Sequence, residues 1–229
     1  GLHCSLADGL RALGHEVCVA SDGCGWKNYP RDIALDRPTN SLYDGISCLL
    51  RILRHLPSFR NYDVVQLISP YFLHLRSERT LPAYHYLRRF NGKVFLGAFG
   101  TDYYYIRACM ETDTYRYSDF KTGNGYRDTD FNKMTLQDWY YGGAAHATRT
   151  IAESCNGIMA CLLEYYVAYQ LLFPEKTAFV PLPINLHKIV SRIRTVPEIL
   201  NFFIGIQNFK DTVKGTDVML PVLQEVQRK

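Results

Sequence analysis

Short apolar runs alternate with amphipathic helical stretches along most of the 229-residue chain. Apolar runs bounded by turn residues predict buried strands, and apolar residues at helical spacing predict helices. Strands that alternate with helices in this way pair in parallel, so the chain predicts an α/β fold with a doubly wound parallel sheet. The predicted strands are 15–20, 64–68, 93–99, 157–161, 178–180 and 202–206, and the predicted helices are 5–13, 41–56, 79–90, 103–111, 135–154, 163–173 and one from residue 215 onward.

Charge and cysteine content exclude several classes of protein. The net charge is only +4 and no basic cluster marks one face, so a nucleic-acid-binding protein is not predicted. The seven cysteines form no C-x-x-C pair and have no zinc spacing with histidine. This pattern predicts free thiols in a reducing compartment and no metal site. No apolar run reaches the roughly 18 residues of a membrane span.

Ligands of open parallel sheets bind at the carboxyl ends of the strands. The residues just after the predicted strands are therefore the first candidates for a binding site. Those that we expect to contact a ligand are Trp26, Tyr71, Gly100, Thr101, Asp102 and Tyr103.

Tyrosine is concentrated in one part of the chain. Eight of the 17 tyrosines lie between Tyr103 and Tyr141, together with Trp139 and a polar segment, 112–134, that has no predicted element. A loop of this length in a compact domain is usually functional or mobile. Aromatic rings with a hydroxyl suit a wet, partly apolar cleft, where they can stack on sugars and bond to their hydroxyls. The alternative for half of these rings is core or helix packing.

Four segments resemble, in the same order, segments of the GT-B glycosyltransferases. The closest resemblance is to the large retaining family that builds bacterial capsules, lipopolysaccharides and exopolysaccharides. Two positions depart from the family pattern, because Phe99 stands where a histidine is common and Ile206 where an arginine is expected. The matching segments are the LADGLRALGHEV stretch at 6–17, the turn Gly100-Thr101-Asp102, the VPLPIN stretch at 180–185, and the FFIG stretch at 202–205 with the KGTD stretch at 214–217.

The resemblance implies two Rossmann-like domains, of which the first binds the acceptor and the second binds a nucleotide-sugar such as a UDP- or GDP-sugar. It places the first domain at residues 1–183, a linker at 184–200 and the first βα unit of the second domain at 201–229. No cofactor or metal ion is implied, because cationic side chains and helix N-termini neutralise the diphosphate. The donor diphosphate would be held by Lys214, Lys210 and Gly205.

Asp102 is the candidate catalytic residue under this resemblance. Its carboxylate would position the acceptor hydroxyl or take its proton. The alternative is that Asp102 caps the predicted helix 103–111, since aspartate is a favoured N-cap residue. The two roles do not exclude each other.

We therefore expect a metal-independent hexosyltransferase, retaining by resemblance, that moves a sugar from a nucleotide-sugar to a saccharide or lipid-linked acceptor in cell-surface polysaccharide synthesis. The alternatives are a sugar-nucleotide epimerase of the same fold and a non-catalytic carbohydrate- or nucleotide-binding module. We expect the protein in the cytoplasm or peripherally at the inner face of the cell membrane.

The ends of the chain carry one further expectation. The chain opens in a helix and stops one βα unit after the linker, so we expect that a first strand and most of a second domain are missing. These 229 residues would then be inactive alone. The alternative is that the last βα unit packs on the sheet edge of the first domain.

Overall fold

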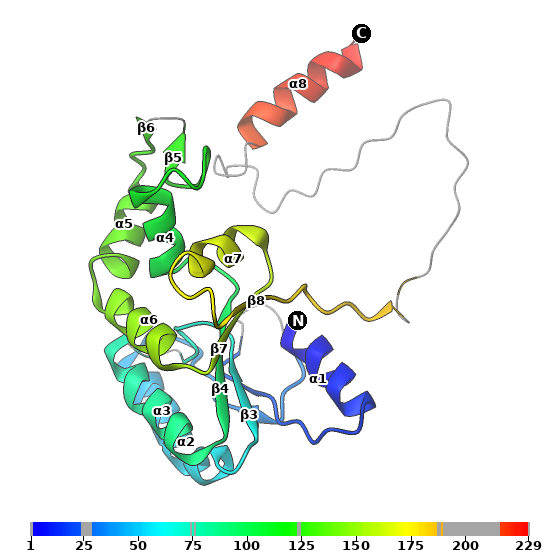
Figure 1. Cartoon of the computed structure of the whole chain (residues 1–229), viewed down its shortest axis with the longest axis vertical. Coiled ribbons are helices and arrows are strands. Elements are labelled where there is room, and N and C mark those ends of the chain that lie inside the picture. The colour runs from blue at the N-terminus through cyan, green and yellow to red at the C-terminus, as the bar shows by residue number, and fades with distance from the viewer. Residues whose placement is uncertain are drawn as a thin grey trace. The chain divides into compact units, whose positions relative to one another are not determined.

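The computed structural model describes residues 2–23, 29–73, 75, 77–122, 125–186, 189 and 216–228. The chain divides into two units, 1–186 and 187–229 (Figure 1). In the second unit the structure describes one helix of 13 residues, α8, Thr216–Arg228. The predicted strand 202–206 and most of the predicted linker 184–200 lie outside the described residues.

A four-stranded parallel sheet forms the centre of the first unit. Its strands follow one another in chain order, β3-β4-β7-β8, and every neighbouring pair is parallel. The predicted α/β fold with a parallel sheet is therefore confirmed. The strands are β3 (Val64–Leu67), β4 (Lys93–Ala98), β7 (Gly157–Ala160) and β8 (Thr177–Phe179).

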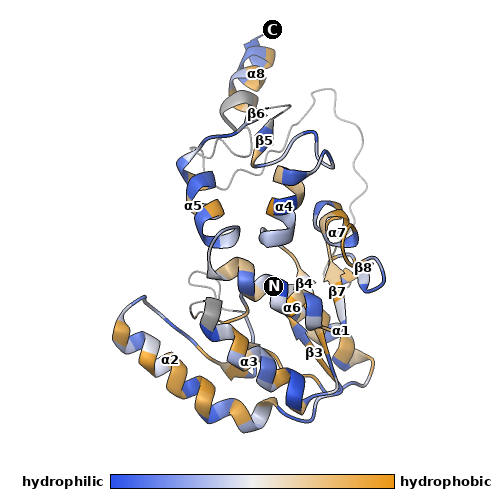
Figure 2. Cartoon of the chain, turned by 60° about the vertical axis from the view of Figure 1, so that its left-hand side comes forward, coloured by the Kyte–Doolittle hydropathy of each residue, from blue (hydrophilic) through white to orange (hydrophobic). Residues whose placement is uncertain are grey.

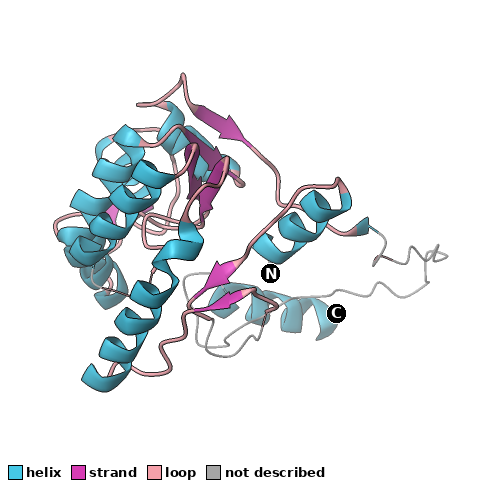
Figure 3. Ribbon diagram, turned by 90° about the horizontal axis from the view of Figure 1, so that it is seen from below, coloured by secondary structure: helices cyan, strands magenta, loops and turns pink. Residues whose placement is uncertain are grey.

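Helices lie on both sides of this sheet. Figure 1 shows α3 and α6 on one side and α1 on the other, and Figure 3 gives the view from below. The His3 ring of α1 lies 5.8 Å from the Phe99 ring just after β4. The helices of the first unit are α1 (Leu2–Ala12), α2 (Leu42–His55), the short 3₁₀ helix η1 (Leu56–Phe59), α3 (Ser77–Phe90), α4 (Tyr103–Glu111), α5 (Asp130–Trp139), α6 (Gly143–Ser154) and α7 (Leu163–Gln170).

The main core lies between the sheet and the pair α3 and α6. Leu96 of β4 and Ile158 of β7 are buried there against Tyr84 of α3 and Ile151 of α6. The Tyr84 hydroxyl hydrogen-bonds the Ser154 hydroxyl at 2.7 Å, so its polar end is satisfied inside the core. Burying each aliphatic side chain of this kind contributes about 1.5–3 kcal/mol to folding. This core fixes the carboxyl ends of β3 and β4, where the candidate site lies.

The predicted strand 15–20 is wrong. Only Ala20–Ser21 forms a strand, β1, and it pairs in parallel with β2, Ile33–Ala34, apart from the four-stranded sheet. The start of β2 and two side chains bind the backbone before it, since the Val19 carbonyl accepts from the amides of Asp32 and Ile33 at 2.8 and 3.1 Å. The Val19 amide donates to Asp32 Oδ2 at 2.7 Å, and Arg11 Nη2 donates to the Val17 carbonyl at 2.8 Å. The run therefore meets β2 only at its end, and Asp32 and Arg11 bind the backbone before that point.

The predicted helix 135–154 is two helices, α5 and α6, separated at Gly142. Gly142 has an extended backbone, with φ −91° and ψ −170°. A Cβ atom there would lie 2.7 Å from the carbonyl oxygens of Gln137 and Asp138, so only glycine allows the chain to turn so closely past α5. Because both halves share helical periodicity, the sequence pattern alone does not reveal the break.

The polar segment 112–134 contains structure that was not predicted. Two short strands, β5 (Lys121–Thr122) and β6 (Gly125–Tyr126), pair antiparallel, and α5 starts within the segment at Asp130. Buried Asn132 joins the two parts, because its Nδ2 donates to the carbonyl oxygens of Asp119 and Arg127 at 2.9 and 2.7 Å.

Candidate functional site

The carboxyl ends of β3 and β4 border a cavity of about 260 Å³, which we call the strand-end cavity. It lies where ligands of open parallel sheets bind. Four of the six predicted contact residues line it, namely Tyr71, Gly100, Thr101 and Asp102. The other residues that line it are Ser69, Pro70, Gly97, Phe99 and Trp139.

Gly97 sets how closely β4 approaches the end of β3. A Cβ atom at this position would lie 2.7 Å from the Leu67 carbonyl oxygen and 2.8 Å from the Ile68 carbonyl oxygen. Backbone atoms at these distances cannot move aside without breaking the β3–β4 pairing. Gly100, in contrast, has nothing within 4 Å of the corresponding position, so its backbone is open toward the cavity.

Two aromatic rings, those of Tyr71 and Trp139, lie next to each other in the cavity wall. The Tyr71 and Trp139 ring centroids are 6.0 Å apart at an angle of 69°, an edge-to-face arrangement. The turn after β3 holds Tyr71, because its backbone amide donates to Ser69 Oγ at 3.1 Å. Burial raises the pKa of the Tyr71 hydroxyl, which therefore stays protonated and able to donate at neutral pH.

Asp102 is the N-cap of α4 and is 2 % exposed. Its Oδ1 accepts from the amides of Tyr104 and Tyr105 at 3.0 and 3.1 Å. Its Oδ2 accepts from the Tyr169 hydroxyl of α7 at 2.7 Å. The capping alternative is thus confirmed, and both carboxylate oxygens already have partners. That Asp102 also takes a proton from an acceptor stays a prediction.

Burial raises the pKa of Asp102 to about 6, because a carboxylate loses hydration in the interior. The three hydrogen bonds, the one from Tyr169 first, lower the pKa in part. The pKa of Tyr169 is raised well above its ordinary value by burial and by the carboxylate beside it. At neutral pH the pair is therefore a carboxylate that accepts from a protonated phenol.

The Tyr169→Phe variant should raise the pKa of Asp102 above its value of about 6, because it removes the hydrogen bond that most favours the ionised form. NMR titration of the Asp102 carboxyl carbon measures this shift. The matched control is Tyr84→Phe, which removes another buried tyrosine hydroxyl that bonds to Ser154 and not to Asp102. An unchanged pKa in the Tyr169→Phe variant would contradict this account of the pair.

Tyr103 does not line the strand-end cavity. It borders a second cavity of about 430 Å³ between α4, α6 and the segment after α7, together with Arg107 and Glu153. Its ring stacks on Tyr140, with centroids 5.5 Å apart, and the Arg149 guanidinium lies 5.4 Å from its centroid. Tyr103 therefore lies outside the cavity that Tyr71, Gly100 and Thr101 line.

Four predicted site residues lie outside the described residues. They are Trp26, for which acceptor binding was predicted, and the predicted donor-binding residues Lys214, Lys210 and Gly205. Among the residues that the structure describes, no group of three or more histidine, cysteine, aspartate or glutamate side chains could hold a metal ion. The six described cysteines are free thiols.

Several residues of the site are not predicted to act in it. Trp139 belongs to the aromatic stretch and Phe99 is a departure from the family pattern, but neither is predicted to bind a ligand, and Gly97 is predicted only as part of a strand. Tyr169 lies 67 residues from Asp102 and within an apolar helix, so no local pattern could indicate that it binds this carboxylate. For Trp139 the aromatic enrichment was a usable signal, but its proximity to Tyr71 comes only from the fold.

No protein-family model, curated protein or solved structure matches the chain.

Proposed function

We propose that the strand-end cavity binds the acceptor of a glycosyltransferase, and that the first unit is the acceptor domain of that enzyme. The observation that carries the proposal is the Tyr71–Trp139 pair beside the open Gly100-Thr101 turn, at the carboxyl ends of parallel strands. Sugars present C–H faces and hydroxyl groups together, and this wall offers aromatic rings, a phenol and a threonine hydroxyl.

Each lining group has a separate part in this proposal. The rings of Tyr71 and Trp139 contact the apolar face of an acceptor sugar, and the Thr101 hydroxyl bonds to its polar edge. The turn places the acceptor, and Asp102 holds the turn, because its carboxylate fixes the start of α4. Asp102 is then a positioning residue, with proton acceptance as the further role that its raised pKa of about 6 would suit.

The donor side of the proposal rests on the sequence resemblance. Lys210, Lys214 and Gly205 would hold the diphosphate of a UDP- or GDP-sugar, whose departure needs cationic stabilisation. The acceptor would be a saccharide or a lipid-linked saccharide, and the reaction would belong to the synthesis of cell-surface polysaccharide in the cytoplasm.

The Trp139→Ala and Tyr71→Ala variants test the acceptor site, because each removes one of the two rings. We expect each to weaken saccharide binding by about tenfold, since a stacked ring contributes on the order of 1 kcal/mol or more. Ligand-observed NMR with a panel of oligosaccharides measures binding to the chain. Transfer from UDP- and GDP-sugars by the complete protein measures activity. The control is Tyr117→Ala, which removes a 62 % exposed ring that is not among the residues lining the cavity.

Equal binding by the control and the site variants would place the acceptor elsewhere. Absence of any transfer or donor hydrolysis across the panel would reject the transferase. A product formed from the nucleotide-sugar with no acceptor present would indicate the epimerase instead.

One observation favours a second candidate, a non-catalytic carbohydrate-binding module. Both Asp102 carboxylate oxygens are occupied by hydrogen bonds within the protein, which leaves no free carboxylate in the cavity wall. Saccharide binding that depends on Tyr71 and Trp139, without turnover by the complete protein, is the result that would select this candidate.

A further inference from the structure

Helix α2 exposes a continuous apolar surface, which we call the α2 stripe. Leu42 and Tyr43 are 81 % and 80 % exposed, and the other four side chains are between 43 % and 61 % exposed. The stripe is long, because it runs through most of the 14 residues of the helix. Its members are Leu42, Tyr43, Ile46, Leu49, Leu50 and Leu53.

The positions of these residues make one uninterrupted face. At about 100° per residue they fall within an arc of roughly 120°, and no polar residue of α2 falls inside that arc. The side of α2 that packs on the protein is marked by only two buried residues, Cys48 and Ile52. Figure 2 shows hydrophobic residues along α2 at the periphery of the first unit. In most amphipathic helices the face exposed to solvent is polar, but on α2 that face is apolar.

The size of the stripe argues against a second copy of the chain as its partner. Fourteen helical residues span about 21 Å, and one face of such a helix is far smaller than the roughly 800 Å² per partner of a stable interface. A bilayer needs no matching surface, so a short apolar stripe is sufficient to enter it.

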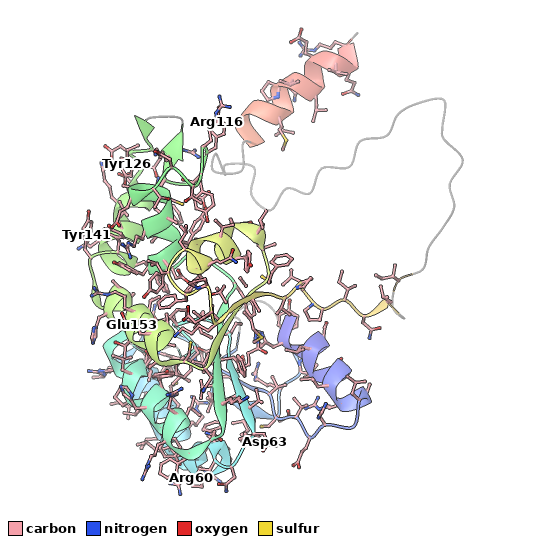
Figure 4. The ribbon with its side chains drawn as sticks, viewed as in Figure 1. Arg60, Asp63, Arg116, Tyr126, Tyr141 and Glu153 are labelled. Atoms are coloured by element: carbon pink, nitrogen blue, oxygen red, sulfur yellow. The ribbon has the colours of Figure 1, made fainter. Side chains whose placement is uncertain are left out.

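The charges beside the stripe favour an anionic surface. Arg54 follows the stripe directly on its polar edge and is exposed, and Arg51 lies beyond it on the same edge. Arg60, just past η1, contacts α3 instead, where its Nε donates to the Tyr86 hydroxyl and its guanidinium lies 4.3 Å from the Phe90 ring centroid (Figure 4). The one acidic residue of α2, Asp44, is at the other end, where Thr39 hydrogen-bonds its carboxylate.

We propose that α2 lies in the headgroup layer of an anionic bilayer, with the α2 stripe among the acyl chains and with Arg54 against lipid phosphates. Helices with one apolar face and basic residues along its border bind membranes in this way. The proposal goes beyond the sugar chemistry and does not depend on it, since it uses neither the strand-end cavity nor a nucleotide-sugar. Among the described residues, no helix is both long and apolar enough to cross a membrane.

Co-sedimentation with vesicles of phosphatidylcholine, with and without phosphatidylglycerol, tests the proposal. We expect the chain to bind the vesicles that contain phosphatidylglycerol, and the Leu50→Asp/Leu53→Asp variant to bind them at least tenfold more weakly. The matched control is Leu162→Asp/Leu163→Asp, which places the same two charges on leucines at the start of α7 that are 41 % and 65 % exposed, and it should leave binding unchanged. Arg54→Glu should weaken binding and reduce its dependence on salt.

A Tyr43→Trp variant reports the position of the stripe directly, because indole fluorescence shifts to the blue when the ring leaves water. We expect this shift on addition of the anionic vesicles. Three results would overturn the proposal. They are no vesicle binding by the unchanged chain, equal binding by the Leu50→Asp/Leu53→Asp variant, or a dimer in solution that this variant dissociates, which would assign the stripe to a second copy.

Discussion

Replacement of Asp102 by alanine is expected to lower the free energy of unfolding by about 3 kcal/mol. The variant leaves three buried donors without an acceptor, the amides of Tyr104 and Tyr105 and the hydroxyl of Tyr169. Each such group costs about 1–3 kcal/mol, and relief from burying a carboxylate offsets part of that sum. Urea unfolding followed by circular dichroism at neutral pH measures the difference.

Asp102→Asn is the matched variant, because asparagine caps helices as well as aspartate and keeps a group that can pair with Tyr169. It also isolates the effect of charge. Burial raises the pKa of Asp102 from 3.8 to about 6, so the folded protein holds this proton more tightly than the unfolded chain. The proton-linked part of the stability is therefore fully present below about pH 4 and is lost as the pH rises through about 6, whereas the part that comes from the three hydrogen bonds is the one measured at neutral pH.

The loss over this window is about 3 kcal/mol, since each pKa unit corresponds to about 1.4 kcal/mol. The Asp102→Asn variant should lack this part of the pH dependence, and the difference between its unfolding curves and those of the unchanged protein measures it. Full stability of Asp102→Ala, combined with loss of sugar transfer, would instead give Asp102 a chemical role and reject the structural one.

Replacement of Gly97 by alanine is expected to lower the free energy of unfolding by about 3 kcal/mol, at the upper end for overpacking. The new methyl group would lie 2.7 and 2.8 Å from the carbonyl oxygens of Leu67 and Ile68, and 2.6 Å from the Phe99 ring. The ring can move, but the two oxygens belong to the chain at the end of β3. Relief of the clash therefore requires separation of β3 from β4.

Gly100→Ala is the control for this substitution, because Gly100 lines the same cavity and has nothing within 4 Å of the added carbon. We expect it to change stability by less than about 0.5 kcal/mol. Hydrogen exchange of the β3 and β4 amides would show whether the Gly97→Ala effect lies at their pairing. Equal stability of the two alanine variants would show that the close approach at Gly97 is not a constraint.

The sequence predicts the four central strands because each is a buried apolar run that ends at turn residues. The predicted bounds of β3 and β7 are within one residue of the observed ones, and α4 agrees at both ends. The run at 15–20 also contains an apolar stretch, Val17 to Ala20, but it has no neighbouring strand for most of its length. Pairing is decided by distant parts of the chain, so composition cannot distinguish this run from the others.

The candidate site likewise has features that the local sequence predicts and features that depend on packing between distant elements. The turn Gly100-Thr101-Asp102 and the capping role of Asp102 follow from local chemistry, because residue types there have strong positional preferences. The partner of Asp102 and the Tyr71–Trp139 pair depend on where α7 and α5 pack, which no local pattern encodes. The tyrosine-rich stretch was ambiguous for the same reason, since Tyr104 and Tyr105 are buried whereas Tyr117 and Tyr141 are exposed.

The order of the sheet, β3-β4-β7-β8, has a consequence for how the first unit folds. Within this sheet, each strand pairs with the sheet strand that comes before it in the chain. The sheet can therefore grow by one strand at a time in the direction of synthesis. The connection from β4 to β7 is more than twice as long as the one from β3 to β4 and carries α4, α5 and α6. Each doubling of a loop adds about 0.6 kcal/mol to the entropy of closure. We therefore expect β7 to dock after β3 and β4 have already paired.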